Sequence, residues 1–382
     1  MAKSLRKFSL GERVEVEIDG IAHGGESVAR LDGWVFFIRH AIPGERVIAQ
    51  ITEVGKSFHR ADALEILSPS PDRVTSPCSY FHPGGCGGCD FQHISLERQR
   101  ALKSQIITEQ FQRVAKMTLT VPVQEVALEI DSGSRYRGRL TLHVDRTGQA
   151  GFLRNRSHEV FPITDCLVAS EKLGVGKVLA ARHVDVDRIS LPDEMRIEEI
   201  HVHGNSFQYR VSKESFWQGH IRAAEVLGEA ALNSLSPRKG ERALDLYGGV
   251  GLFAKLLASA GARVEIIESS SAAISDAQFN LRDFSDVRFH EGDVAKEIVK
   301  VKEAEIVLLD PPRSGAELVV LEQIVKLAPR RICYISCDPA SLARDTQRLA
   351  ERGYQLVQSA AFDLFPQTAH IECVFTFEPV IS

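Results

Sequence analysis

A cysteine in the second half of the chain stands where a nucleophile could act. Cys337 follows the apolar run 331–335, which predicts a buried strand, and it precedes a pattern typical of a helix. A thiol between the carboxyl end of a strand and a helix is well placed for chemistry, because ligands bind at that edge of an open α/β sheet. The helix N-terminus should also favour the thiolate. A small buried core thiol is the alternative, since this is the commoner place for a lone cysteine.

Four other cysteines have the arrangement of metal ligands. Cys78, Cys86 and Cys89 share one glycine-rich segment, and Cys166 stands in a predicted turn. Thiolates this close would repel one another without a cation, and zinc or an iron–sulfur cluster would satisfy them. The lack of an interleaved histidine pair favours the cluster, although unligated thiols remain an alternative. The spacing is not the Cys-x3-Cys-x2-Cys of radical enzymes, so the cluster is predicted to be structural.

From about residue 214 the chain alternates between predicted strands and helices, which indicates a doubly wound parallel sheet. The segment 242–251 predicts a strand that contains Asp245 and runs into a glycine-rich turn. The next strand ends in Glu268, a carboxylate placed to hold a ribose diol. Asp293 closes a third strand, where an adenine would bind. No Gly-x-Gly-x-x-Gly follows the first strand, which favours S-adenosylmethionine over a dinucleotide.

Two further carboxylates lie at predicted strand ends. A fourth strand, 305–309, ends in Asp310-Pro-Pro-Arg313, where the prolines would stiffen a loop that grips a flat ring. Arg313 in place of an aromatic residue argues against an exocyclic amine as the methylated group. Glu372 lies inside an apolar strand, where a carboxylate is costly unless it is used or paired. An ordinary ion-paired glutamate is the alternative there.

The first part of the chain predicts a small β-barrel from short, regularly spaced strands. Its basic residues could form a groove for a nucleic-acid backbone, or could be ordinary solvated charges: Arg30, Arg39, His40, Lys56, His59 and Arg60. Farther on, alternation predicts a strand that presents Arg135, Arg137 and Arg139 on one face, with Tyr136 between them. Such a patch suits phosphates and unstacked bases. A solvated strand face is the alternative.

Composition limits the partners and the compartment. The net charge of −5 on 382 residues gives no overall basic field, so a nucleic acid would have to meet a local patch. No segment has the length and hydropathy of a signal peptide or membrane span. We therefore expect a cytoplasmic protein with reduced thiols, no membrane partner and a monomeric state.

Together, these motifs resemble the RNA uracil-5-methyltransferase family, and in particular its iron–sulfur branch with an N-terminal TRAM barrel, which includes 23S rRNA m5U enzymes. The resemblance spans nearly the whole chain and rests on the four clustered cysteines, Phe216-Trp-Gln218, the Asp245 loop, Asp310-Pro-Pro-Arg313, Ser336-Cys-Asp-Pro339 and His370-Ile-Glu372. Three features depart from the family pattern. The Cys78–Cys86 spacing is two residues longer, Gly248 replaces a Cys or Ser, and His220 replaces an Asn.

The resemblance implies a Rossmann-like class I methyltransferase domain, a TRAM barrel, and a central α+β domain with a [4Fe–4S] cluster held by Cys78, Cys86, Cys89 and Cys166. It implies domains at 8–67 for the barrel, 68–93 with 117–213 for the central domain, and 94–116 with 214–382 for the methyltransferase. Cys337 falls on the nucleophile and Glu372 on the base. The family's cofactor and substrate positions fall on Gln218, Tyr247, Glu268, Asp293 and Asp310.

The activity that the resemblance implies is C5 methylation of a uridine in RNA. The thiolate of Cys337 would add to uracil C6 and make C5 nucleophilic toward the methyl group of S-adenosylmethionine. Glu372 would then remove the C5 proton, after the base has left its stack. Ribosomal RNA is the expected partner and tRNA the alternative. A cytosine-5 RNA methyltransferase and a non-catalytic RNA-binding chaperone are rival hypotheses.

Overall fold

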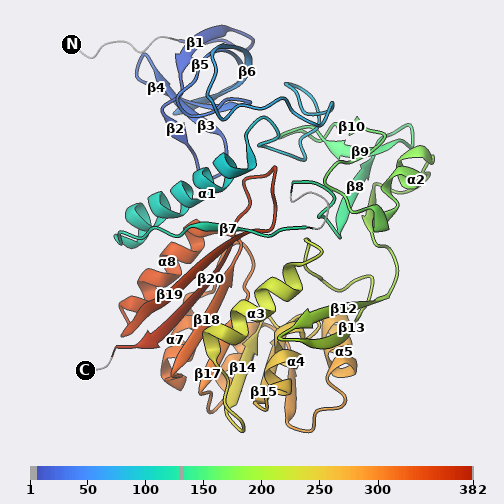
Figure 1. The fold of residues 1–382 in the computed structure, drawn as a ribbon, viewed down its shortest axis with the longest axis vertical. Coiled ribbons are helices and arrows are strands. Elements are labelled where there is room, and N and C mark those ends of the chain that lie inside the picture. The colour runs from blue at the N-terminus through green and yellow to red at the C-terminus, as the bar shows by residue number, and fades with distance from the viewer. Residues whose placement is uncertain (1–6, 129–132, 381–382) are drawn as a thin grey trace.

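The structure, a computed structural model, describes residues 7–128 and 133–380. It consists of a barrel-like sheet, a small central sheet, and a large sheet covered by helices on both faces (Figure 1). The large sheet and the barrel-like sheet lie at opposite ends of the molecule in this view, and helix α1 (Leu96–Gln110) runs between them.

The N-terminal strands form the expected small barrel. Every second residue of β1 is buried, as the alternation of valine and charged residues predicts. The order in the sheet is β1-β5-β6-β4-β3-β2, and β1 also contacts β3. The strands are β1 (Arg13–Glu17), β2 (Gly20–Ile21), β3 (Ser27–Leu31), β4 (Trp34–Arg39), β5 (Arg46–Val54) and β6 (Phe58–Ser68).

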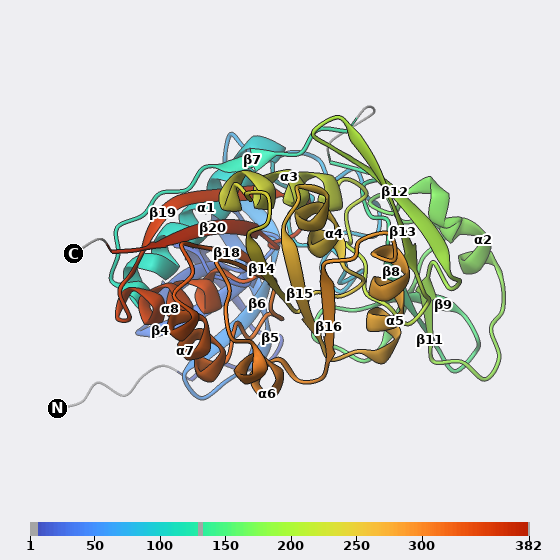
Figure 2. The same cartoon turned by 90° about the horizontal axis from the view of Figure 1, so that it is seen from below.

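The large sheet has eight strands in the order β16-β15-β14-β17-β18-β20-β19-β7. Strands β14 to β18 are mutually parallel, and β20 runs antiparallel to β18 and β19. Figure 2 shows the labelled strands of this sheet in the order β19, β20, β18, β14, β15 and β16. The strands are β7 (Val123–Glu125), β14 (Arg242–Leu246), β15 (Arg263–Glu268), β16 (Val287–Glu291), β17 (Ile306–Leu309), β18 (Arg331–Ser336), β19 (Tyr354–Asp363) and β20 (Glu372–Pro379).

Two apolar cores lie on the two faces of this sheet. One face packs against α3, α4 and α5, and the other against α1, α6, α7 and α8. The continuous apolar runs of β17 and β18 fit strands that are buried on both faces. The helices are α3 (Ala223–Leu235), α4 (Leu252–Ser259), α5 (Ser271–Asn280), α6 (Val294–Glu297), α7 (Leu318–Leu327) and α8 (Pro339–Ala350). A π-helical turn, η1 (Phe111–Ala115), continues α1, and a 3-10 turn, η3 (Ile298–Lys300), follows α6.

The central sheet has the order β10-β9-β8-β11 and carries α2 (Val175–Ala180) after the turn η2 (Glu171–Leu173). Its strands are β8 (Leu140–Val144), β9 (Ala150–Leu153), β10 (Val160–Pro162) and β11 (Arg188–Leu191). A separate hairpin of β12 (Arg196–Val202) and β13 (Asn205–Val211) packs against α3 and α5, in the core of the large sheet. The boundaries predicted from the sequence place this hairpin and β7 in the central domain, within 117–213. In the structure, β7 is part of the large sheet and the hairpin packs in its core.

No helix among residues 7–128 and 133–380 is both long and apolar enough to cross a bilayer.

Candidate active site

The carboxyl ends of β14 and β17 meet where the strand order reverses, which is the usual ligand position in such sheets. After β14 the chain turns sharply through Tyr247, Gly249 and Gly251, whose φ angles are 61°, 53° and 81°. A tyrosine in this left-handed region is uncommon and marks a constrained turn. Asp245 is fully buried there, its Oδ2 accepts a hydrogen bond from the Ala254 amide, and burial raises its pKa to about 8.

One carboxylate oxygen of Asp245 is available to a ligand. Its Oδ1 is buried and has no hydrogen-bond partner in the described parts of the chain. A buried carboxylate oxygen without a donor is costly, and a cationic ligand at this strand end would relieve that cost. This fits the ammonium group of S-adenosylmethionine.

Glu268 and Asp293 occupy the ends of the next two strands, as the sequence predicts. Glu268 accepts hydrogen bonds from the Gly249 amide at 3.0 Å and the Ser270 amide at 2.7 Å, so it is fixed beside the glycine turn. Asp293 is exposed and caps α6 through the Lys296 amide. The three acidic groups therefore follow one another along the same edge of the sheet, from β14 to β16.

Asp310 and Gln218 are brought together from distant segments. Burial raises the pKa of Asp310 to about 7, and a hydrogen bond from Gln218 opposes this shift. The segment before Gln218 is fixed by the buried Asp276 of α5, which accepts hydrogen bonds from the Ser212 amide at 2.8 Å and the Ser215 hydroxyl at 2.7 Å. The amide of Gln218 is thus held against the carboxyl end of β17.

Cys337 lies between β18 and α8, as predicted, but its expected acidity is wrong. Burial raises the pKa of the thiol to about 12, and the neighbouring charges of Glu372 and Asp310 raise it further, while Arg313 opposes them. The N-terminus of α8 is also already occupied, because the Asp338 carboxylate accepts a hydrogen bond from the Ser341 amide at 2.8 Å. The free thiol is therefore protonated at neutral pH.

Glu372 opens β20 beside this thiol and is buried. Burial raises its pKa to about 8, the charge of Asp310 raises it further, and Arg313 lowers it. A carboxyl group that changes charge near neutral pH can take up a proton and release it again. The structure thus brings Cys337, Glu372, Asp310 and Gln218 into one cluster.

A contact that the sequence did not predict borders this cluster. Nη2 of Arg313 lies 3.1 Å from Nδ1 and 3.2 Å from Nε2 of His370. Burial and the charge of Arg313 lower the pKa of His370 to about 4, so its ring is neutral. The only sequence signal was that both residues stand in motifs already singled out, 310–313 and 370–372.

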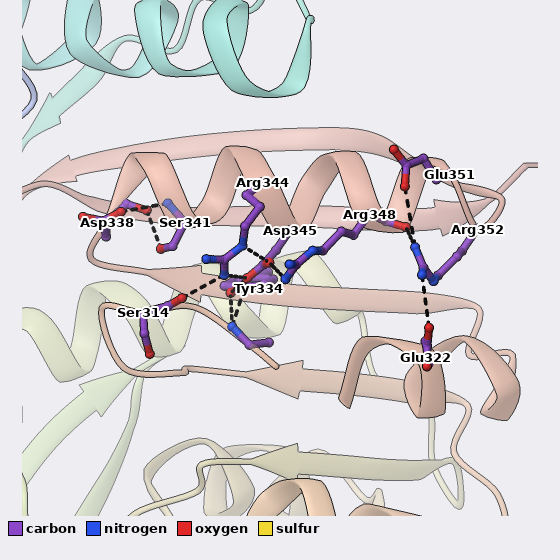
Figure 3. A network of polar contacts seen from close by, with 11 residues as sticks. Ser314, Glu322, Tyr334, Asp338, Ser341, Arg344, Asp345, Arg348, Glu351 and Arg352 are labelled. Carbon is purple, nitrogen blue, oxygen red and sulfur yellow. Dashed lines mark hydrogen bonds and ion pairs between the residues drawn. The ribbon is translucent and has the colours of Figure 1, made fainter. Parts of the chain in front are cut away.

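A buried network ties the loops of Cys337 and Asp310 to each other (Figure 3). Asp345 on α8 is fully buried and accepts hydrogen bonds from the Ala316 amide at 2.9 Å and the Tyr334 hydroxyl at 2.8 Å. Arg344 donates to Asp345 and to the Ser314 carbonyl oxygen at 2.8 Å. Helix α8, which begins just after Cys337, is therefore fastened to the segment that follows Asp310-Pro-Pro-Arg313.

The barrel also reaches the candidate active site. Nε2 of His23, in the turn between β2 and β3, lies 3.0 Å from Oδ2 of Asp338. In the same turn, a side chain at Gly25 would collide with Ala369, because a Cβ atom there would lie 2.5 Å from its Cβ. The barrel thus packs directly on the two loops that carry Cys337 and Glu372.

The four clustered cysteines line one cavity, together with Tyr80, Gln92 and Phe152. Burial raises the pKa of Cys86 to about 11 and also raises those of Cys89 and Cys166. The glycine segment packs closely here, since a Cβ at Gly87 would lie within 3 Å of the backbone of residues 153–155. No group of three or more His, Cys, Asp or Glu side chains in the described ranges is arranged to hold a metal ion.

The cluster therefore stays a prediction. All four cysteines line one cavity, although Cys166 lies 77 positions after Cys89. Four cysteine side chains around one cavity are a donor set that suits an iron–sulfur cluster.

His220, the departure from the family pattern, is buried and packs on Tyr136 with a ring distance of 5.4 Å. Its Nδ1 accepts a hydrogen bond from the Arg222 amide, and burial lowers its pKa to about 3. The ring is therefore a neutral packing element next to the segment that carries Gln218.

The predicted arginine strand is wrong. Residues 133–139 form an irregular segment, in which Arg137 makes single bridges to His220 and Ala169. Arg135 pairs with Asp165 at 2.7 Å, and Arg139 lies over the Phe216 ring. The three guanidinium groups therefore serve different contacts, because loop packing rather than strand alternation sets their directions.

Four of the six basic residues that could form a groove on the barrel are wholly or partly buried. Arg39 donates to the Cys89 carbonyl oxygen, Arg60 pairs with Glu26, and His40 and His59 are buried. Arg39 and Arg60 are half-buried, whereas Arg30 and Lys56 are exposed.

Comparisons with known proteins agree with this geometry. The model of the tRNA (Uracil-5-)-methyltransferase family matches residues 166–290 and 293–379, and the TRAM domain model matches residues 7–64. The chain belongs to the tRNA (uracil-5-)-methyltransferase family. It is an RNA methyltransferase with an N-terminal TRAM domain, and S-adenosylmethionine is the methyl donor of this family.

The chain is similar to several members along nearly its whole length. It is 42% identical to an uncharacterized RNA methyltransferase of Streptomyces avermitilis, over 97% of this chain and 99% of the relative. It is 32% identical to the 23S rRNA (uracil(1939)-C(5))-methyltransferase RlmD of Shewanella woodyi, over 99% and 98%. The crystal structure of the Pyrococcus abyssi tRNA (uracil-54, C5)-methyltransferase with S-adenosyl-L-homocysteine shares the fold, with a TM-score of 0.71, 22% identity and coverage of 95% and 99%.

Proposed function

We propose that this enzyme methylates C5 of a specific uridine in 23S rRNA through a covalent adduct between Cys337 and uracil C6. The observation that carries the mechanism is the convergence of Cys337, Glu372 and Asp310, because the charge of Asp310 raises the pKa of the other two and the charge of Glu372 raises that of Cys337. The similarity to the Shewanella rRNA enzyme supports the substrate class. The same reaction on tRNA is the second candidate, supported by the fold shared with the Pyrococcus enzyme.

Uracil C5 is a weak nucleophile, so the ring must be activated before methylation. The thiol of Cys337 releases its proton to water, Sγ forms a bond to C6, and the electron pair of the 5,6-bond moves toward C5 and O4. Arg313, which lowers the pKa of the thiol, favours the loss of this proton. Asp310 and Gln218, already hydrogen-bonded to each other, are placed to hold the polar edge of the uracil.

S-adenosylmethionine supplies an electrophilic methyl group when it is bound. We assign its binding to Gln218, Tyr247, Glu268, Asp293 and Asp310, with Asp245 beneath the glycine turn. Glu268 suits a ribose diol because its carboxylate is already oriented by two backbone amides, and Asp293 lies one strand farther along the same edge.

Glu372 then completes the reaction as the base. It removes the C5 proton, the 5,6-double bond forms again, and the bond between C6 and Sγ of Cys337 breaks. A pKa of about 8 lets the carboxylate form exist in a useful fraction at neutral pH and still gives it the basicity to accept a proton.

We further propose that Cys78, Cys86, Cys89 and Cys166 hold a [4Fe–4S] cluster with a structural role. Supporting it are their shared cavity, the close backbone approach at Gly87, and the repulsion that four thiolates would otherwise suffer. The domain division proposed is 8–67 for the TRAM barrel, a central domain around the cysteines, and the methyltransferase around the large sheet. The protein is proposed to be a cytoplasmic monomer.

Two substitutions test the mechanism directly. Cys337→Ala should abolish methylation and every covalent complex with RNA, including the complex with RNA that contains 5-fluorouracil. Glu372→Gln should still transfer the methyl group but stall before elimination, so that a protein–RNA adduct accumulates on a denaturing gel. Methylation by Cys337→Ala would exclude the mechanism, whereas normal turnover by Glu372→Gln would return that residue to a structural role.

The substrate is tested separately. Mass mapping of 5-methyluridine in rRNA and tRNA from a deletion strain and its parent should show the loss of one 23S rRNA site. Loss from tRNA alone would favour the second candidate.

A further inference from the structure

The loop 364–371 leads directly into the proposed base. It joins β19 to β20, and Glu372 is the first residue of β20. In Figure 1 this loop rises, in dark red, from the large sheet toward α1. Its backbone conformation therefore decides where the Glu372 carboxylate lies relative to Cys337.

Gln367, in the middle of this loop, has an unusual and tightly held conformation. Its φ is 67°, a region that residues other than glycine rarely adopt. Its backbone amide donates to Oε1 of Gln99 at 2.8 Å, and its side-chain Oε1 accepts from Nε2 of Gln99 at 3.0 Å. Both side chains are buried, and Gln99 is fully so. The amide of Gln99 thus fixes both the backbone and the side chain of a strained residue.

The same glutamine connects the loop to the cysteine segment. Nε2 of Gln99 also lies 3.0 Å from the Phe91 carbonyl oxygen and 2.8 Å from that of Ile94. The Gln367 carbonyl oxygen accepts hydrogen bonds from the amides of Asp90 and Phe91, at 2.8 and 3.0 Å. Asp90 directly follows Cys89, and its Oδ2 accepts from the Ala369 amide at 3.2 Å.

Two other contacts hold the loop at its start. Nζ of Lys103, one turn after Gln99 on α1, donates to the Phe365 carbonyl oxygen at 3.0 Å and to Oδ1 of Asp363 at 2.6 Å. The Tyr136 hydroxyl donates to the Pro366 carbonyl oxygen at 2.8 Å. These groups support residues 363–366, whereas Gln99, together with the amides of Asp90 and Phe91, holds the strained Gln367 closer to Glu372.

We propose that Gln99 is a positioning residue for the proton-abstraction step, acting through Gln367 on Glu372. The inference rests on the proposed function and extends it, because it assigns a catalytic consequence to a buried amide on α1. Cys337 is supported by different contacts, through Asp345 on α8. Loss of the Gln99 contacts should therefore slow elimination without an equal effect on addition of the thiol.

The test compares Gln99→Met, which keeps the length of the side chain and removes its hydrogen bonds, with Gln105→Met. Gln105 lies on the same helix, and its side chain donates a hydrogen bond to Glu109, away from the loop 364–371. Gln367→Asn is a second variant, since asparagine tolerates the left-handed conformation but is too short to keep the paired contacts.

Adduct formation on 5-fluorouracil RNA measures addition and methyl transfer, and turnover on uridine RNA includes elimination. For Gln99→Met and Gln367→Asn we expect turnover to fall about tenfold or more, a fraction of what a general base contributes, with the adduct accumulating as in Glu372→Gln. Adduct formation on 5-fluorouracil RNA should stay within about threefold of the parent, and Gln105→Met should match the parent in both assays.

The outcomes separate the two proposals. An adduct in Glu372→Gln but in neither Gln99→Met nor Gln367→Asn overturns the positioning role alone. A parallel fall in both rates in the two variants also overturns it, because it indicates a merely structural effect. If the parent forms no adduct on 5-fluorouracil RNA, the proposed function fails and this inference fails with it.

Discussion

At the scale of single residues, the candidate active site is a set of acids held at raised pKa values. Asp245, Asp310 and Glu372 reach pKa values of about 8, 7 and 8 because burial disfavours their charged forms. The charge of Asp310 adds to this shift at Asp245 and Glu372. The site therefore favours neutral or cationic ligands over anions. Binding of a cationic sulfonium cofactor would offset part of the repulsion between the carboxylates.

The pKa of Glu372 predicts how elimination depends on pH. Only the carboxylate can accept the C5 proton, and its fraction rises as the pH increases toward about 8. Well below this pKa, the decay of the covalent adduct should become about tenfold faster per pH unit, and it should level off above it. Rapid quenching of a preformed adduct between pH 6 and 9.5 would measure this rate. A rate that does not change with pH would remove Glu372 from the step.

The positions of these side chains could be predicted from the sequence, whereas their pKa values could not. Asp245, Glu268, Asp310 and Cys337 follow apolar runs, and ends of parallel strands share one edge, so their convergence could be inferred. The raised pKa of Cys337 could not, because it depends first on burial and then on Glu372, which comes from an antiparallel strand whose position the sequence does not encode locally.

At the scale of elements, helix α8 is fixed by one buried carboxylate. Asp345 accepts hydrogen bonds from Ala316, Tyr334, Arg344 and Arg348, and it reaches the loop that follows Asp310. Gly315 must be glycine there, since its φ is 78° and a Cβ would lie 2.4 Å from Oδ2 of Asp345.

This network yields a stability prediction. Asp345→Ala removes a shared acceptor of Tyr334, Arg344, Arg348 and the Ala316 amide, and loss of such a hydrogen-bond partner costs about 1–3 kcal/mol. Urea unfolding should show this loss in the free energy of unfolding. Glu322→Ala, which removes an exposed partner of Arg352 on the adjacent helix, should cost less than about 1 kcal/mol. Equal effects of the two changes would contradict the role of the network.

The elements that the sequence did not predict are those that depend on distant partners. Alternation in 135–139 suggested a strand, but Tyr136 is drawn into the core and the neighbouring arginines pair with Asp165 and Phe216. Strand β7 has only three residues, too short for a periodic signal, and it exists because the edge of β19 accepts it.

At the scale of the whole molecule, the barrel packs against the catalytic loops. His23 contacts Asp338, and Glu26 in the same turn contacts both Arg60 of the barrel and Arg156 of the central domain. The TRAM domain therefore takes part in shaping the active site in addition to any contact with RNA.

The contact of His23 with Asp338 predicts a measurable effect. His23→Ala should lower turnover several-fold by loosening the start of α8, while the affinity for S-adenosylmethionine stays nearly unchanged, because Glu268 and Asp293 are remote from the barrel. Exposed pairs contribute about 0.2–1 kcal/mol, so the thermal stability should change little. Steady-state kinetics and isothermal calorimetry would measure both. A weakened affinity for S-adenosylmethionine with normal turnover would contradict this view.

The four clustered cysteines predict the absorbance of an iron–sulfur cluster. Protein purified without oxygen should be brown, with iron and sulfide in a cluster ratio, and Cys86→Ser should lose this absorbance. Cys333→Ser changes a buried cysteine of β18 that does not line this cavity; it is the control and should keep the absorbance. Zinc without iron or sulfide in the parent protein would overturn the cluster.

The long-range contacts of α1 determine how long two of its residues stay without their partners while the chain is synthesised. Lys103 and Gln99 find their partners 260 and 268 residues later, at Asp363 and Gln367. At 5–20 residues per second, a ribosome needs roughly 10 to 50 seconds to make that stretch. During this time a lysine destined for full burial stays in water, and the nascent cysteine segment lacks the loop that will cover it. Chaperones would meet the protein in this interval, before its last two strands emerge.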